Sequence, residues 1–180
     1  MTSGESSIRK GRLGHSNNVE RTAFNKEVAS KLEEFGWRCE PDYKITKLLG
    51  LSLDRDYGDV DALAWDPHTG RILAIECKDL HFHKTMGEVA EQLSDFHGLI
   101  KSDGSRDLLR KHLDRIAVME KNKALIAARL GLNSMTDLRG YIVFRNPVPM
   151  QFAWEEMKAK IDLLIFDQLE SLRISESRAE

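Results

Sequence analysis

The chain has 180 residues, of which 41% are hydrophobic, and its formal net charge is -2. This length and composition suit one globular domain with an ordinary core. The near balance of charge excludes a protein that is basic throughout, so any surface for nucleic acid has to be local. No stretch has the length of a membrane span or the pattern of a secretory signal, and we therefore expect a cytoplasmic protein without a membrane partner.

The first part of the sequence predicts an arm, a helix and a strand. Residues 1–17 are polar and rich in Ser and Gly, which is typical of a flexible arm. Residues 18–35 have apolar positions at helical spacing, and Gly36 follows where a helix would end. Residues 37–45 can form a first strand. We expect a single domain over residues 18–174, followed by a polar tail at 175–180.

Two apolar runs with acidic and basic residues follow, at 58–65 and 72–78. The sequence Asp-Pro-His-Thr-Gly at 66–70 joins them, and its Pro and Gly favour a hairpin of antiparallel strands. Side chains alternate along a strand, so this pattern predicts shared faces for two pairs of charged residues. Asp59 and Asp61 form one pair and Glu76 and Lys78 the other, while Val60, Ile75 and Cys77 point the opposite way into a core.

Charged side chains among apolar strand residues have to be paired, hydrated or bound to an ion. Asp61 and Glu76 supply the oxygen ligands that Mg²⁺ or Mn²⁺ prefers, and the backbone carbonyl of Cys77 is a further donor. Lys78 lies beside these groups, where an ammonium can orient a water molecule or neutralise charge on a phosphate. The pattern therefore predicts a metal site for hydrolysis.

At these residues the chain resembles the PD-(D/E)xK nuclease superfamily, in particular its Mrr-like and Holliday-resolvase-like branches. Glu76-Cys77-Lys78 matches the ExK half of the motif, Asp61 matches the metal-binding acid on the preceding strand, and Asp59 fits a Gly-Asp-x-Asp variant. The resemblance implies that Asp61 and Glu76 bind metal and that Lys78 is catalytic.

The opening helix also resembles that of the superfamily, in which one acid commonly reaches the metal. The expected position holds Asn25 in this chain, with Glu20 a little over one turn earlier and Glu27 half a turn later. Glu20 is the favoured candidate because it lies at the helix entrance, but Glu20 and Glu27 are equally well explained as solvated surface acids.

A further helix is predicted from Thr85 to about Gly98, because Thr85 and Glu88 have the spacing of a capping box. Gln92 falls within its apolar stripe. Superfamily members often have a Gln on this helix near the metal or the scissile phosphate, so Gln92 is a candidate catalytic residue, and a buried structural hydrogen bond explains it equally well.

Residues 99–137 are predicted to form a helical insert. Its segment 101–129 holds eight basic and four acidic residues, and we expect the basic side to face outward, as a phosphate-binding face or as ordinary solvated surface. A strand at 141–144, a helix at 152–160 and a strand at 161–166 complete the predicted elements.

Together these elements predict an α/β fold with a mixed sheet of about five strands flanked by helices. The resemblance implies a metal-dependent endonuclease that hydrolyses phosphodiester bonds, with DNA as the expected substrate, in restriction, defence or repair. A homodimer or a partner protein would then choose the target. The alternative is a non-cleaving nucleic-acid-binding or scaffolding module of the same fold. An enzyme acting on another phosphate compound is less well supported, since there is no Gly-rich phosphate loop.

Overall fold

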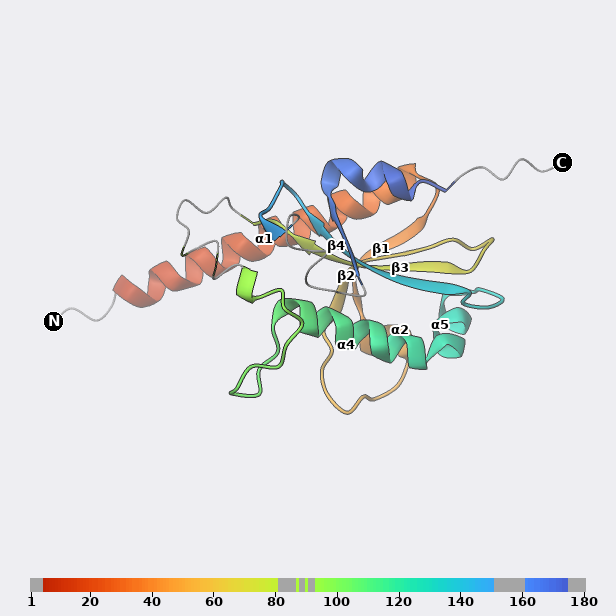
Figure 1. Cartoon of the computed structure of the whole chain (residues 1–180), viewed down its shortest axis with the longest axis horizontal. Coiled ribbons are helices and arrows are strands. Elements are labelled where there is room, and N and C mark those ends of the chain that lie inside the picture. The colour runs from red at the N-terminus through yellow and green to blue at the C-terminus, as the bar shows by residue number, and fades with distance from the viewer. Residues whose placement is uncertain (1–4, 81–86, 88–89, 91–92, 151–160, 175–180) are drawn as a thin grey trace.

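The computed structural model describes residues 5–80, 87, 90, 93–150 and 161–174. These residues form a mixed five-stranded sheet with helices on both faces (Figure 1), which confirms the predicted α/β class. The strand order follows the chain, with antiparallel pairs from β1 to β3 and parallel pairs from β3 to β5. The strands are β1 Arg38–Lys44, β2 Asp59–Trp65, β3 Arg71–Lys78, β4 Asp137–Phe144 and β5 Asp162–Ile165.

Helix α1, Glu5–Glu34, packs along one face of the sheet against β1, β2 and β3. Phe24, Val28 and Leu32 are buried at intervals of four residues and form its apolar stripe. The chain leaves the helix at Gly36, whose φ of +94° is costly for other residues. The helix begins earlier than the predicted start at residue 18, so residues 5–17 have helical backbone, while the flexibility predicted for 1–17 stays a prediction.

Strands β2 and β3 form the antiparallel hairpin that the sequence predicted, and the structure places it inside the sheet between β1 and β4. The amide of Gly70 donates to the carbonyl of Asp66 at 2.9 Å and closes the turn. Both strands are almost entirely buried because helices cover the two faces of the sheet. This explains why their sequences are nearly continuous apolar runs, in which every charged residue stands out.

Helices α2 Ile45–Leu49, α4 Leu108–Lys121 and α5 Lys123–Leu130 cover the opposite face (Figure 1). The Asp107 side chain caps α4 by accepting a hydrogen bond from the Arg110 amide. Helix α4 lies close to β4 at Gly140, where a Cβ atom would overlap the Ile116 side chain. This close approach places the buried side of α4 directly against the sheet.

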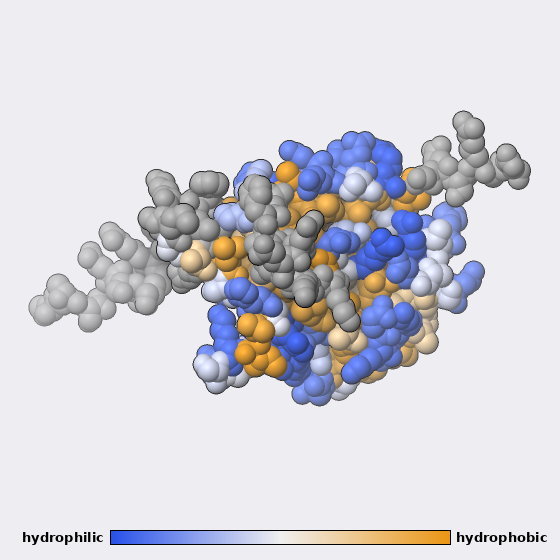
Figure 2. Space-filling model, viewed as in Figure 1, coloured by the Kyte–Doolittle hydropathy of each residue, from blue (hydrophilic) through white to orange (hydrophobic). Residues whose placement is uncertain are grey.

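A short 3-10 helix, η1 Phe166–Leu172, follows β5 and contacts α1. The Trp37 indole donates to the Leu172 carbonyl at 2.7 Å and fixes η1 to the start of β1. In Figure 2 the outer surface at η1 is hydrophilic, and apolar atoms show beneath it toward the sheet. The sequence predicted the strand before η1 but not η1 itself.

Three predicted features lie outside the described residues. They are the capping box at Thr85 and Glu88, the helix at 152–160 and the polar tail at 175–180. Both α4 and α5 fall within the predicted helical insert at 99–137, and β4 begins at its last residue.

Candidate functional site

The pairing of β2 with β3 stops at Ala62 and Ile75, and the charged residues lie just beyond this point. Asp61 is fully buried, and its Oδ2 accepts a hydrogen bond from the Cys77 amide at 2.9 Å. The Asp61 carboxylate thus accepts the hydrogen bond of a β3 amide beyond the point where the backbone pairing of β2 with β3 stops. This contact brings Asp61 to the ExK segment, as the sequence predicted.

The expected orientation of Val60 is wrong. Val60 packs in the core cluster of Tyr43 and Ile45, whereas Ile75 and Cys77 pack in the other cluster, together with α1. The side chains of β2 therefore do not alternate strictly through Asp61. A pattern of strict alternation could not anticipate this irregularity.

Glu76 is only 4% exposed and lies at the centre of a group of basic side chains. Its Oε1 accepts from the Lys78 ammonium at 2.5 Å, and its Oε2 accepts from the Arg115 guanidinium. The Nδ1 atom of His112, which is also fully buried, lies 3.9 Å from Oε2. Glu76 therefore joins β3 to helix α4 through buried charges.

The two carboxylates respond differently to this environment. Burial and the nearby charge of Glu76 raise the pKa of Asp61. Burial alone would also raise the pKa of Glu76, but the charges of Lys78 and Arg115 outweigh it and lower that pKa. The pair thus has one firmly ionised acid and one whose charge the folded protein disfavours.

Helix α1 adds polar groups from the other side. Arg21 reaches Asp61 with a 2.8 Å ion pair, although its side chain is 56% exposed. One turn later, the buried Asn25 donates from Nδ2 to Asp42 at 2.6 Å. Asp42 has a φ of +53° and is skipped in the pairing of β1 with β2, so the chain is locally irregular there. The helix position that the superfamily gives to an acid thus faces an aspartate of β1.

The other predicted site residues do not join this cluster among the residues that the structure describes. Glu20 and Glu27 are exposed on α1, and Glu27 pairs with Arg145 at 2.8 Å. Asp59 is half-buried at the start of β2, opposite Lys44. Within the described ranges no three acidic, His or Cys side chains are grouped to hold a metal, which leaves Asp61 and Glu76 as the carboxylate pair. Gln92 lies outside the described residues.

Three residues of the site were missed or misplaced by sequence reasoning: Arg21, His112 and Arg115. Arg115 was expected on an outward basic face, but it is buried and pairs with Glu76, 39 positions away. The sequence feature that could have indicated burial of Arg115 is its position three residues after the buried His112, on the same face of α4. His112 itself is an ionisable residue in the apolar stripe of α4, and burial lowers its pKa to about 4.

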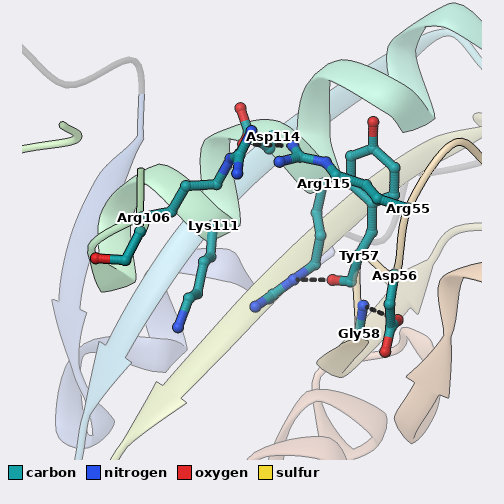
Figure 3. A pocket seen from close by; sticks show the side chains of 9 residues that line it. Arg55, Asp56, Tyr57, Gly58, Arg106, Lys111, Asp114 and Arg115 are labelled. Carbon is teal, nitrogen blue, oxygen red and sulfur yellow. Dashed lines mark hydrogen bonds and ion pairs between the residues drawn. The ribbon is translucent and has the colours of Figure 1, made fainter. Parts of the chain in front are cut away.

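A cavity of about 450 Å³ adjoins the cluster and is lined by the loop before β2 and the first half of α4 (Figure 3). Arg55 and Arg106 both reach Asp114, at 2.6 and 2.8 Å. Arg115 forms part of the wall and donates to the Tyr57 carbonyl at 2.9 Å. The same arginine therefore contacts both the cavity and Glu76.

The fold and the cluster define an α/β protein with a buried acid pair and a lysine at the open end of a central hairpin. The chain belongs to the Upx-like anti-phage protein family, whose model matches residues 5–167. No curated protein and no solved structure matches it. The family indicates a defence-related protein. None of the helices in the described part of the chain has the length and hydropathy to cross a bilayer.

Proposed function

We propose that this anti-phage protein is a metal-dependent nuclease with Asp61, Glu76 and Lys78 as its active site, and with DNA as its substrate. The observation that carries the proposal is the pair of buried carboxylates near the start of β2 and the end of β3. The Lys78 ammonium lies 2.5 Å from the second of them, Glu76. Two acids that can bind a metal, with a lysine that can orient water, are groups suited to metal-assisted phosphodiester hydrolysis.

The residues present fit a divalent cation. The negative charge of Glu76 helps to raise the pKa of Asp61, and a cation between the two carboxylates would relieve this repulsion. The Asn25 Oδ1 atom is buried and makes no hydrogen bond within the described residues. An amide oxygen is a suitable ligand for Mg²⁺ or Mn²⁺, so Asn25 fits the position at which the superfamily has an acid.

The residues of the chain divide the chemistry among them. Asp61 and Glu76, with the Cys77 carbonyl, would hold the metal, which supplies Lewis acidity toward the phosphate. Lys78, one strand position beyond this carbonyl, orients the attacking water and offsets negative charge on the phosphate. Arg21, at the exposed side of the cluster, is placed to contact the substrate backbone.

One observation favours a second candidate, a module that binds nucleic acid without cleaving it. Arg21 pairs with Asp61, and Arg115 pairs with Glu76, so both carboxylates have cationic partners from the chain itself. Such pairs can stabilise buried acids in a protein that binds no metal. In that case the cluster would serve the fold, and the defence role would depend on binding alone.

The test is cleavage of plasmid DNA, linear duplex, single-stranded DNA and RNA by the wild type and Lys78→Ala, with Mg²⁺, with Mn²⁺ and with EDTA. We expect metal-dependent cutting of DNA that falls about 100-fold or more in Lys78→Ala. Lys44→Ala, which changes an exposed lysine on the neighbouring strand β1, is the matched control and should cut normally. Binding without cutting under every condition would support the second candidate.

A further inference from the structure

The cavity between the 55–58 loop and α4 has more cations than its own acids can neutralise. Four basic side chains line it against two acidic ones, Asp56 and Asp114. Asp114 is already shared, since Arg110 pairs with it at 2.9 Å in addition to Arg55 and Arg106. Even if the charge of Glu76 is counted as neutralising Arg115, the basic residues that line the cavity outnumber the acidic ones.

Lys111 contributes a positive charge that is not neutralised by an acidic residue lining the cavity. Its side chain is exposed at the cavity and makes no ion pair or hydrogen bond within the ranges that the structure describes. In Figure 3 the Lys111 ammonium and the Arg115 guanidinium extend to the same side, away from Asp114. An ammonium on the same side as a fixed guanidinium group is an arrangement that suits a phosphate.

The arginines of the cavity are held in place before any ligand arrives. Asp114 fixes Arg55 and Arg106, and the Tyr57 carbonyl fixes Arg115. Preorganised donors lose little conformational entropy when an anion binds. The cavity thus combines fixed guanidinium groups with Lys111, whose side chain has no ion pair or hydrogen bond in the part of the chain that the structure describes.

We infer that this cavity binds a phosphate group of a nucleic-acid strand, with Lys111 as its principal ligand and the Arg115 guanidinium, which extends to the same side, beside it. The identity of the ligand rests on the proposed function. Arg115 places the cavity next to Glu76, so the bound phosphate is one that flanks the position of cleavage. The contact fixes the strand and does not read sequence.

The test is fluorescence anisotropy of a short fluorescein-labelled DNA duplex with the full chain in EDTA, so that binding is measured without cleavage. We expect Lys111→Glu to weaken binding about tenfold and Lys111→Ala to lower the slope of log K against log salt by about 1. Lys121→Glu, which reverses an exposed lysine at the far end of the same helix, should bind as the wild type does. Equal binding by the Lys111→Glu and Lys121→Glu variants, or no binding by the wild type, would overturn the inference.

The phosphate could belong to a nucleic-acid strand or to a free nucleotide, and competition with a mononucleotide distinguishes these two ligands. We expect dAMP to displace the duplex only at concentrations far above those of the unlabelled duplex, because a strand makes several phosphate contacts. Displacement by dAMP at concentrations comparable to those of the duplex would overturn the assignment to a nucleic-acid strand. Binding is measured in EDTA, so a protein that does not cleave DNA can still give the predicted loss of binding in Lys111→Glu. Failure of the phosphate site and failure of the proposed nuclease activity can therefore be distinguished.

Discussion

Two buried aspartates stand at opposite ends of strand β2 and have opposite electrostatics. Asp66, at the turn, is 2% exposed and accepts hydrogen bonds from the His68 amide at 2.9 Å and the Thr69 hydroxyl at 2.5 Å. Burial alone would raise the pKa of Asp66, but these hydrogen bonds outweigh it and lower that pKa. Asp61, at the open end, is also buried, and burial together with the nearby charge of Glu76 raises its pKa.

The difference separates an acid that serves the fold from one that is suited to chemistry. Hydrogen bonds from its own turn stabilise the charge on Asp66, so folding favours the ionised form. Burial and the nearby charge of Glu76 act together on Asp61 and outweigh its ion pair with Arg21, so folding disfavours the charge of Asp61. The first arrangement closes a hairpin, whereas the second fits the metal site that we propose at Asp61 and Glu76.

The largest effect on stability is expected from Glu76. Its charge is stabilised by the folded protein, as that of Asp66 is, and it also belongs to the proposed site together with Asp61. Glu76→Gln removes the charge that faces Arg115 and leaves a buried guanidinium without its anion, so we expect a loss of about 3 kcal/mol in the free energy of unfolding. The double variant Glu76→Gln/Arg115→Met should recover most of this loss. Urea unfolding measures both, and an unchanged single variant would contradict the buried pair.

This expectation alters which variant tests catalysis. If Glu76 and Lys78 served only catalysis, alanine at either position would abolish cleavage without unfolding the protein. Because Glu76 is paired with the buried Arg115, we expect its replacement to lower stability as well as the proposed cleavage. Lys78 is the better choice, since Glu76 keeps Arg115 when the lysine is removed.

The next effect concerns His112, which burial keeps neutral. Its pKa is lowered from 6.5 to about 4, so the unfolded chain takes up the proton first as the pH falls. The stability that neutral His112 contributes is present above pH 6.5 and is lost as the pH falls toward 4, which corresponds to about 3 kcal/mol.

The check is urea unfolding of the wild type and His112→Leu at pH 7 and near pH 4. The wild type should lose more stability across this interval than the variant does. Parallel losses in the two proteins would show that His112 is not buried in the neutral form.

A smaller effect is expected at the turn. Asp66→Ala leaves the His68 amide and the Thr69 hydroxyl without their acceptor, which should cost about 1 to 2 kcal/mol of stability. Cleavage measured well below the melting temperature should not change. A loss of cleavage in a folded Asp66→Ala protein would break the contrast between the two ends of β2.

The smallest effect on stability is expected for Asp61→Asn without metal. Because the pKa of Asp61 is raised, its contribution is favourable below the pKa of the unfolded state and is lost as the pH rises through the folded value. At pH 7 the variant should therefore lie within about 1 kcal/mol of the wild type, on the stabilising side. In thermal melts Mg²⁺ should raise the Tm of the wild type and not that of the variant.

The sequence was informative where the signal is local. The Pro and Gly of 66–70 predicted the hairpin, and the charged residues stood out because the strands around them are apolar. The approach of Asp61 to the segment of Glu76 and Lys78 followed from the predicted hairpin. Turn chemistry and the apolar character of the strands sufficed for these features, whereas strict alternation failed at Val60.

The remaining features depend on tertiary packing. Arg115 reaches Glu76 because α4 lies close to β4 at Gly140, and nothing near residue 115 in the sequence records that approach. The positive φ of Asp42 and its bond to Asn25 likewise arise where α1 crosses β1. Charge counts over residues 101–129 could not separate a buried arginine from a solvated one.

The most direct test of the site compares DNA cleavage by Asp61→Asn and Asp66→Asn in Mg²⁺, with EDTA as the blank. Each variant replaces one buried carboxylate, one within β2 and one in the turn directly after it, by a neutral amide of the same shape. We expect Asp61→Asn to be folded and to lose cutting by about 100-fold or more, and Asp66→Asn to be less stable and to cut normally. Normal cutting by a folded Asp61→Asn protein would contradict a metal-dependent nuclease site at Asp61 and Glu76.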